Sequence, residues 1–185
     1  MLNRPSVQGG VSLIELIISV VILAILAAAG APSFAQFIQN RKVRTGAEGV
    51  IQGLNLAKAE AVRRNTSIQI AIAADTGWVV GCTTAVADND GDGQPDCPGN
   101  IQTRPANEGS SGVRSTAITL TFNGYGKIPA LAASSNIEID NPTAGTCEAS
   151  GGNLRCMRIV VSPAGQVRSC DPQMTTSNPG SPLAC

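Results

Sequence analysis

The residues best suited to metal chemistry are four aspartates in one short stretch. They occupy positions 1, 3, 5 and 9 of a calcium-loop pattern: Asp88, Asp90, Asp92 and Asp96. Carboxylates this close repel one another, and a divalent cation would neutralise them. Position 12 is Gly99, which cannot supply the carboxylate that completes such a loop. The stretch therefore predicts either a calcium site or a solvated Asp/Gly turn.

Cysteines form a second chemically informative group, and all six lie beyond residue 81: Cys82, Cys97, Cys147, Cys156, Cys170 and Cys185. No Cys-x-x-Cys pair occurs, which argues against a zinc ribbon or a thioredoxin-like site. An even number confined to one part of the chain is typical of disulfides formed in an oxidising compartment. Six cysteines allow fifteen pairings. We expect local closure, joining Cys82 to Cys97, Cys147 to Cys156 and Cys170 to Cys185; buried free thiols are the alternative.

Composition excludes several functional classes. The 185 residues include no histidine, which removes Ser-His-Asp catalysis, Cys-His catalysis and imidazole metal ligands. No phosphate-binding GxxxxGK[ST] loop is present. The net charge of +0 argues against a protein that mainly coats nucleic acid. We therefore expect a protein that is not an enzyme.

One carboxylate, Glu15, interrupts a run of apolar and small residues that extends from position 11 to about position 31. A helix of about 21 residues rises roughly 30 Å, the thickness of the hydrocarbon core of a bilayer. A carboxylate at the membrane centre costs on the order of 2–3 kcal/mol. The run therefore predicts a membrane anchor in which Glu15 has a partner, or else is tolerated near the interface.

Residues 1–10 form a short polar segment whose possible cleavage site, Gly10, precedes the apolar run. A secretory signal has the opposite order, so the run would survive processing as an anchor. Basic residues are more numerous after the run than before it, which by itself favours a cytoplasmic C-terminal part. The cysteines favour the opposite side, and we follow them: a single-pass inner-membrane protein with residues 65–185 in the periplasm.

The pattern after the anchor predicts an α+β fold, with a long N-terminal helix packed on an antiparallel β-rich head. We expect the helix over 11–64, with an apolar stripe and three glycines that allow close approach to a sheet or form a hinge. The stripe comprises Val43, Ala47, Val50, Leu54, Ala57 and Ala61. Period-two alternation predicts strands at 68–72, 77–80, 118–122, 158–161 and 166–168. Residues 130–152 are polar and glycine-rich, which predicts a loop.

The segment Gly10-Val-Ser-Leu-Ile-Glu15, followed by an aliphatic helix with Pro32, resembles the signal of type IV pilins and type II secretion pseudopilins. The resemblance implies cleavage between Gly10 and Val11 by a prepilin peptidase and methylation of Val11, where the family usually has Phe. It also implies that Glu15 meets the N-terminal amine of a neighbouring subunit.

The run Leu56-Ala-Lys-Ala-Glu-Ala-Val-Arg-Arg-Asn65 resembles the helix end of the GspH/FimT branch of minor pilins and pseudopilins. In the residues themselves, cations in the last turn complement the helix dipole and Asn65 can adopt the left-handed cap. FimT-type minor pilins that bind DNA carry Gly-Arg-x-Arg before a cysteine. Here Gly165 and Arg168 match and Gln166 replaces the first arginine.

These features together predict a minor pilin or pseudopilin that is assembled into a type IV pilus or a type II secretion pseudopilus and primes assembly or sits near the tip. Its expected partners are other pilins, the prepilin peptidase and the inner-membrane assembly platform. The alternative is a DNA-binding minor pilin for natural transformation, with Arg158 and Arg168 as contacts. Apart from calcium, we expect no cofactor.

Overall fold

The computed structural model describes residues 10–88, 96–106, 108 and 110–185, and the chain forms two compact units, 1–37 and 38–185. Helix α1 (Leu13–Arg64) contributes to both units. The predicted start of the helix at residue 11 is two residues early, because Ser12 caps the helix and Val11 lies outside it. Its predicted end at residue 64 agrees with the structure.

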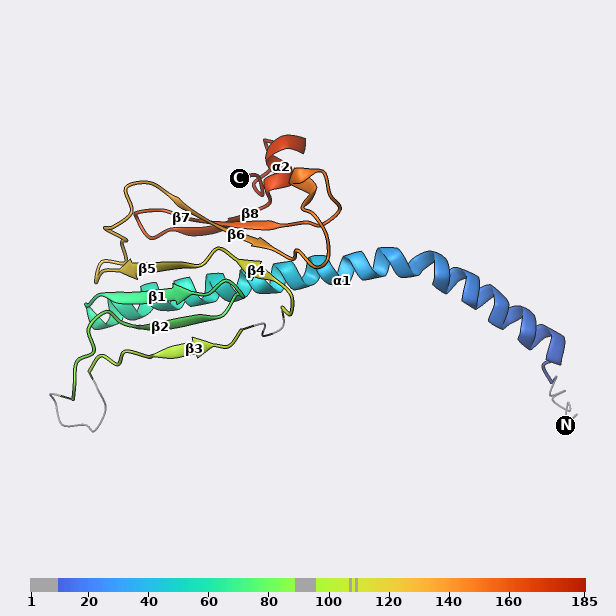
Figure 1. Cartoon of the computed structure of the whole chain (residues 1–185), viewed down its shortest axis with the longest axis horizontal. Helices are drawn as coiled ribbons and strands as arrows, with labels where there is room; N and C mark the ends of the chain where they lie inside the picture. Colours follow the sequence, from blue (N-terminus) through green and yellow to red (C-terminus); the bar gives the residue numbers. More distant parts are fainter. Residues whose placement is uncertain (1–9, 89–95, 107, 109) are drawn as a thin grey trace, which may run out of the picture. The chain divides into compact units, whose positions relative to one another are not determined.

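The first of two antiparallel sheets has the strand order β3-β2-β1-β5 (Figure 1). Its strands are β1 (Ile68–Ile72), β2 (Trp78–Cys82), β3 (Gln102–Arg104) and β5 (Ile118–Phe122). Central strand β1 pairs with β2 and β5, so that Ile70 lies opposite both Val80 and Leu120. These three side chains are buried, which confirms the alternation seen in the sequence.

The second sheet has the order β4-β6-β7-β8. It consists of β4 (Arg114–Ser115), β6 (Ser135–Asp140), β7 (Met157–Val161) and β8 (Val167–Cys170). Strand β6 corrects the prediction that 130–152 is a loop. Within that polar region, Ile137 and Ile139 alternate with polar residues and are fully buried, and pairing with β7 stabilises the strand.

One hydrophobic core joins the second part of α1 to both sheets. All six residues of the predicted helix stripe are buried in it: Val43, Ala47, Val50, Leu54, Ala57 and Ala61. A 3₁₀ turn, η1 (Glu148–Ser150), and a short helix, α2 (Pro172–Ser177), complete the head. The observed fold is therefore α+β, as predicted, with a long helix packed on antiparallel sheets.

Close approach, rather than a hinge, explains the helix glycines. A Cβ atom at Gly53 would lie 2.7 Å from the indole of Trp78, and one at Gly46 would lie 2.9 Å from Val113. Contacts this short would force the sheet away from the helix. The helix is continuous across these positions, so the glycines serve packing.

Candidate functional site

The first unit presents an exposed apolar helix surface. Large side chains from Leu13 to Phe37 are exposed, and the most hydrophobic window of the helix has a mean hydropathy of 2.7 with none of it buried. The helix is long and apolar enough to cross a membrane. Exposure of this kind is unfavourable in water and favourable in a bilayer or a helical bundle.

Glu15 occupies the first turn of this helix and takes part in its N-cap. Its backbone N–H donates to Ser12 Oγ at 3.2 Å, and its carbonyl accepts from the Ser19 hydroxyl at 2.8 Å. A Ser N-cap followed three residues later by Glu is the capping-box arrangement. Among the described residues, no hydrogen bond or ion pair to the Glu15 carboxylate is formed.

The opposite end of α1 is an ion-paired cap built from the helix-end motif. Glu60 Oε2 accepts from Arg63 at 2.6 Å and from Arg64 at 2.8 Å. The hydrogen bond from Arg63 is the largest influence that lowers the pKa of Glu60. Arg64 also donates to the backbone carbonyl of Asp96, next to the Cys82–Cys97 disulfide. The motif thus ties the helix end to a loop of the first sheet.

Asn65 ends the helix in the left-handed conformation that the sequence predicts, with φ of 47°. The N–H of Thr66 reaches the carbonyl of Ala61, and the N–H of Asn65 reaches that of Val62, which is the Schellman pattern. A Cβ atom at Gly124 would lie 2.5 Å from Asn65 Oδ1. Glycine at 124 therefore allows the turn after β5 to pack on the helix cap.

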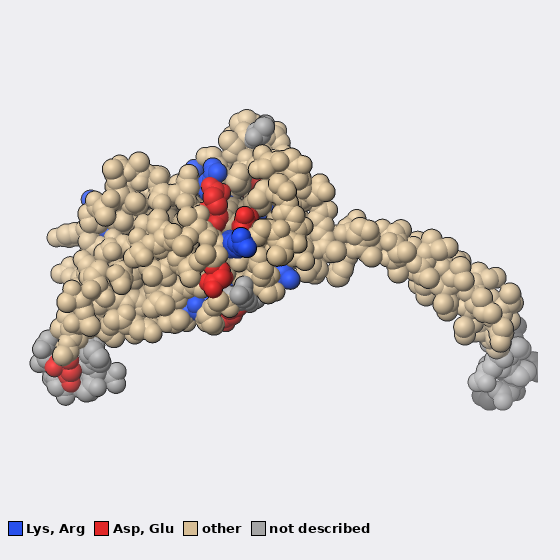
Figure 2. All heavy atoms as spheres, viewed as in Figure 1, with Lys and Arg blue, Asp and Glu red and all other residues tan. Residues whose placement is uncertain are grey.

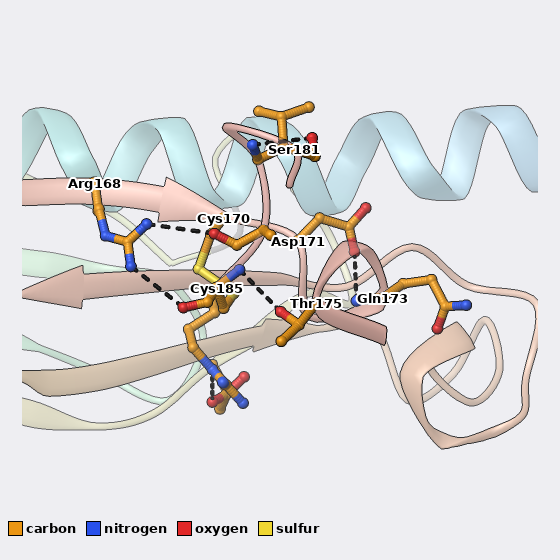
Figure 3. The surroundings of a disulfide bond; sticks show 11 residues. Arg168, Cys170, Asp171, Gln173, Thr175, Ser181 and Cys185 are labelled. Atoms are coloured by element: carbon orange, nitrogen blue, oxygen red, sulfur yellow. Dashed lines mark hydrogen bonds and ion pairs between the residues drawn. A yellow bond between two sulfur atoms is a disulfide. The ribbon is translucent and has the colours of Figure 1, made fainter. Parts of the chain in front are cut away.

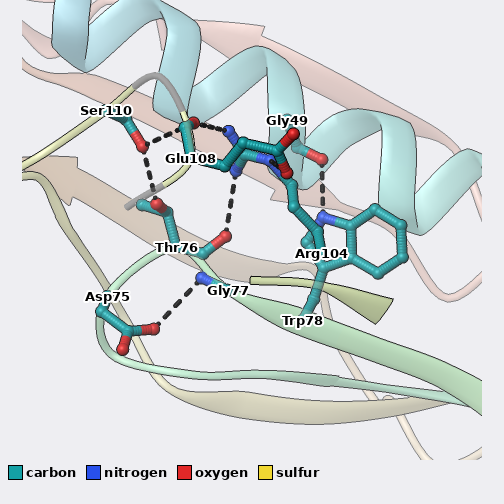
Figure 4. Close-up of polar contacts among 8 residues, drawn as sticks. All are labelled: Gly49, Asp75, Thr76, Gly77, Trp78, Arg104, Glu108 and Ser110. Atoms are coloured by element: carbon teal, nitrogen blue, oxygen red, sulfur yellow. Dashed lines mark hydrogen bonds and ion pairs between the residues drawn. The ribbon is translucent and has the colours of Figure 1, made fainter. Parts of the chain in front are cut away.

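Arg104, which the sequence did not single out, joins the first sheet to α1 (Figure 4). Its guanidinium lies over Gly49 and donates to the carbonyls of Thr76 at 3.1 Å and of Glu108 at 2.5 Å. The indole N–H of Trp78 donates to the Gly49 carbonyl at 2.9 Å. A polar groove of about 560 Å³ lies beside this cluster, between α1 and β3. In the sequence, the sign of this contact is Gly49 itself, because a glycine in a helix leaves room for a side chain from another element.

The candidate calcium loop lies only partly within the described structure. Asp88 and Asp96 are described, whereas Asp90 and Asp92 lie outside the described residues. In the described part of the chain, no group of three or more potential metal ligands comes together. Calcium binding at these aspartates stays a prediction.

The three predicted disulfides are all present: Cys82–Cys97, Cys147–Cys156 and Cys170–Cys185. The last of these fastens the C-terminal segment beside β8 (Figure 3). Arg168 donates to the carbonyls of Ala184 and Cys185, each at 3.4 Å, and Asp171 caps α2 through Gln173 N–H at 2.9 Å. Arg168 is therefore a positioning group for this segment in the present structure.

Arg158 and Arg168 share the outer face of the second sheet, but acidic residues share it too. Arg158 donates to Glu138 on the neighbouring strand at 2.5 Å. Arg155 contacts Asp171 at 3.1 Å and Glu148 at 3.7 Å. Figure 2 shows blue and red spheres mixed in one band that runs across the head. The pairing reduces the positive field that would attract phosphates, and sequence alone could not place Glu138 opposite Arg158.

Comparison with known families identifies the chain. The family described as type II transport protein GspH matches residues 46–165, which span the second part of the helix and most of both sheets. The chain belongs to the GspH family. The prokaryotic N-terminal methylation motif matches residues 5–31, around Gly10, Val11 and Glu15.

A solved structure of a minor pilin shows the same fold. The type IV minor pilin FimU of Pseudomonas aeruginosa, in space group P21, has a TM-score of 0.50 and 19% identity, over 71% of this chain and 90% of that chain. A second crystal form of FimU, in space group P65, has a TM-score of 0.48 and 19% identity, over 70% of this chain and 97% of that chain. No curated protein matches the sequence significantly. The GspH family member described here is a pilin-like protein with a membrane-anchor helix, and such proteins interact with other pilins and with the prepilin peptidase.

Proposed function

We propose that this GspH-family protein is a minor pilin or pseudopilin whose helix leaves the inner membrane to enter a filament, either a type IV pilus or a type II secretion pseudopilus. It primes assembly or sits near the tip, and its head lies in the periplasm before assembly. The observation that carries the proposal is the exposed apolar helix with one carboxylate in its first turn, within the matched methylation motif.

Processing creates the group that completes this site. Cleavage between Gly10 and Val11 gives an N-terminal amine at Val11, which the same peptidase methylates. Within one chain, Val11 precedes the helix N-cap Ser12, so it does not stand one helical turn before Glu15 on the same helix face. The Glu15 carboxylate instead pairs with the Val11 amine of the neighbouring subunit. An opposite charge offsets much of the cost of holding the carboxylate among apolar side chains.

The head contributes protein contacts rather than catalysis. Its buried residues are apolar apart from a few hydrogen-bonded polar groups such as Thr76 and Ser110. The inner-membrane assembly platform recruits the anchored subunit. We therefore assign assembly to the anchor and protein contacts to the head.

Replacement of the carboxylate tests the assembly contact. We expect Glu15→Ala to be cleaved normally but to co-purify with filaments at a level reduced about tenfold, as for the loss of one charge-assisted contact. Mass spectrometry of the N-terminus and immunoblotting of sheared filaments measure the two properties. Ser19→Ala, one turn further along, is the matched control and should assemble normally. Normal incorporation of Glu15→Ala would refute the pairing.

A further inference from the structure

The outer faces of the two sheets differ sharply in charge. The outer face of the second sheet carries five charged residues among its neighbouring strands: Arg114, Glu138, Asp140, Arg158 and Arg168. The outer face of the first sheet carries none. Its residues are Gln69, Ala71, Val79, Gly81, Thr103, Thr119 and Thr121.

Within the described part of the chain, no element covers the centre of this uncharged face. Ala71, Val79, Thr103 and Thr119 are exposed, and Val79 as a residue is 39% exposed. At the Gly81 end, the backbone of Gly99 lies against the face. In Figure 2 the surface over β1, β2 and β5 is uniformly tan, and the band of charged spheres lies beside it.

The core of a protein–protein interface is depleted in charged residues, because a charge that is desolvated without a partner is costly. A sheet face that meets water usually carries polar and charged residues, and the exposed strand positions Arg114, Glu138 and Arg168 of the second sheet follow this rule. The contrast within one head indicates that the first face is desolvated in the working state. We propose that the outer face of the first sheet docks against an uncharged surface on the head of an adjacent subunit in the same filament.

The small area of the face indicates a partner that is anchored in the same membrane or filament, rather than a free protein. Strands of five residues are about 17 Å long and lie about 4.8 Å apart, so the face covers about 300 Å². A stable complex between free proteins buries about 800 Å² on each partner. A contact of this size, without a large aromatic anchor or a charge pair, is too weak to capture a free protein. It becomes effective when both partners are fixed in one membrane or filament, because tethering raises the effective concentration to the millimolar range.

This inference rests on the proposed function, because it requires neighbours in a filament. Site-specific cross-linking tests it in the full-length protein. All six native cysteines are in disulfides, so Thr119→Cys introduces one free thiol on the face, at its exposed β5 edge. The matched control is Asn136→Cys, an exposed strand position on the outer face of the second sheet. A short thiol-attached photo-cross-linker, which inserts into nearby C–H bonds and needs no amine on the partner, is applied to intact cells that assemble filaments.

We expect Thr119→Cys to form adducts with a pilin-type subunit at least about tenfold more often than Asn136→Cys does. Equal yields, or adducts mainly with a soluble protein, would overturn the inference. Introducing a charge on the face is an independent test. Thr119→Lys should co-purify with filaments about tenfold less than Asn136→Lys, and its melting temperature should equal that of the wild type. If the wild type is in filaments and both lysine variants are incorporated equally, the inference alone fails. If the wild type is absent from filaments, the proposed function fails as well.

Discussion

At the scale of single residues, Glu60 holds the end of the long helix together. Glutamate side chains are usually exposed to water. The Glu60 side chain is only 14% exposed and receives hydrogen bonds from Arg63 and Arg64. Arg64 extends the contact to the loop at Asp96. The helix-end motif that identifies the branch in the sequence therefore has a structural role in the head.

We expect Glu60→Gln to lower the free energy of unfolding at pH 7 by about 1 kcal/mol, the size of a partly buried charge-assisted hydrogen bond. The pKa of Glu60 is lowered by Arg63, so the contribution is present above the unfolded-state pKa near 4.5 and is lost as the pH falls through the lower folded-state pKa. Chemical denaturation at pH 7 and at pH 3 measures this. The difference in the free energy of unfolding between the wild type and Glu60→Gln should be smaller at pH 3 than at pH 7.

Glu48→Gln is the control for this prediction, since Glu48 pairs with Arg44 in the same i,i+4 arrangement but is 56% exposed. Its replacement should have no measurable effect at either pH. Equal effects of the two substitutions would show that the burial of Glu60 is unimportant.

At the scale of elements, the helix and the strands with strict alternation could be predicted from the sequence, because their patterns are local. Strand β6 could not, since Ile137 and Ile139 are surrounded by polar and turn-forming residues and the strand depends on distant β7. Strands β3 and β4 contain three and two residues, too few for a period to be visible. The contact of Arg104 with Gly49 also joins distant segments and was not foreseen.

The packing of α1 on the first sheet gives the element-scale prediction. Gly53→Ala adds a methyl group 2.7 Å from the Trp78 ring, and relieving that overlap costs about 1–3 kcal/mol. Alanine returns about 1 kcal/mol through helix propensity. We therefore expect a net destabilisation of the head of up to about 2 kcal/mol, measured by thermal unfolding.

Gly30→Ala is the matched control, because a Cβ atom at Gly30 of the same helix meets nothing within 4 Å. The head should unfold at the same temperature as in the wild type. A stabilised Gly53→Ala head would show that the glycine serves a hinge instead of close packing.

At the scale of the whole molecule, the two units have different surfaces. Unit 1–37 presents apolar side chains suited to a membrane or a helical bundle, with Glu15 as its one described carboxylate. Unit 38–185 has its own core, three disulfides and one uncharged sheet face. The family and anchor were predictable from short motifs, whereas the contrast between the two sheet faces required the strand register.

Mass spectrometry of sheared, purified filaments tests the central claim most directly. The account predicts that this protein is present at low copy number, begins at Val11 and carries an N-methyl group on that residue. Recovery of the protein only from the membrane fraction, with residues 1–10 still attached, would contradict the account.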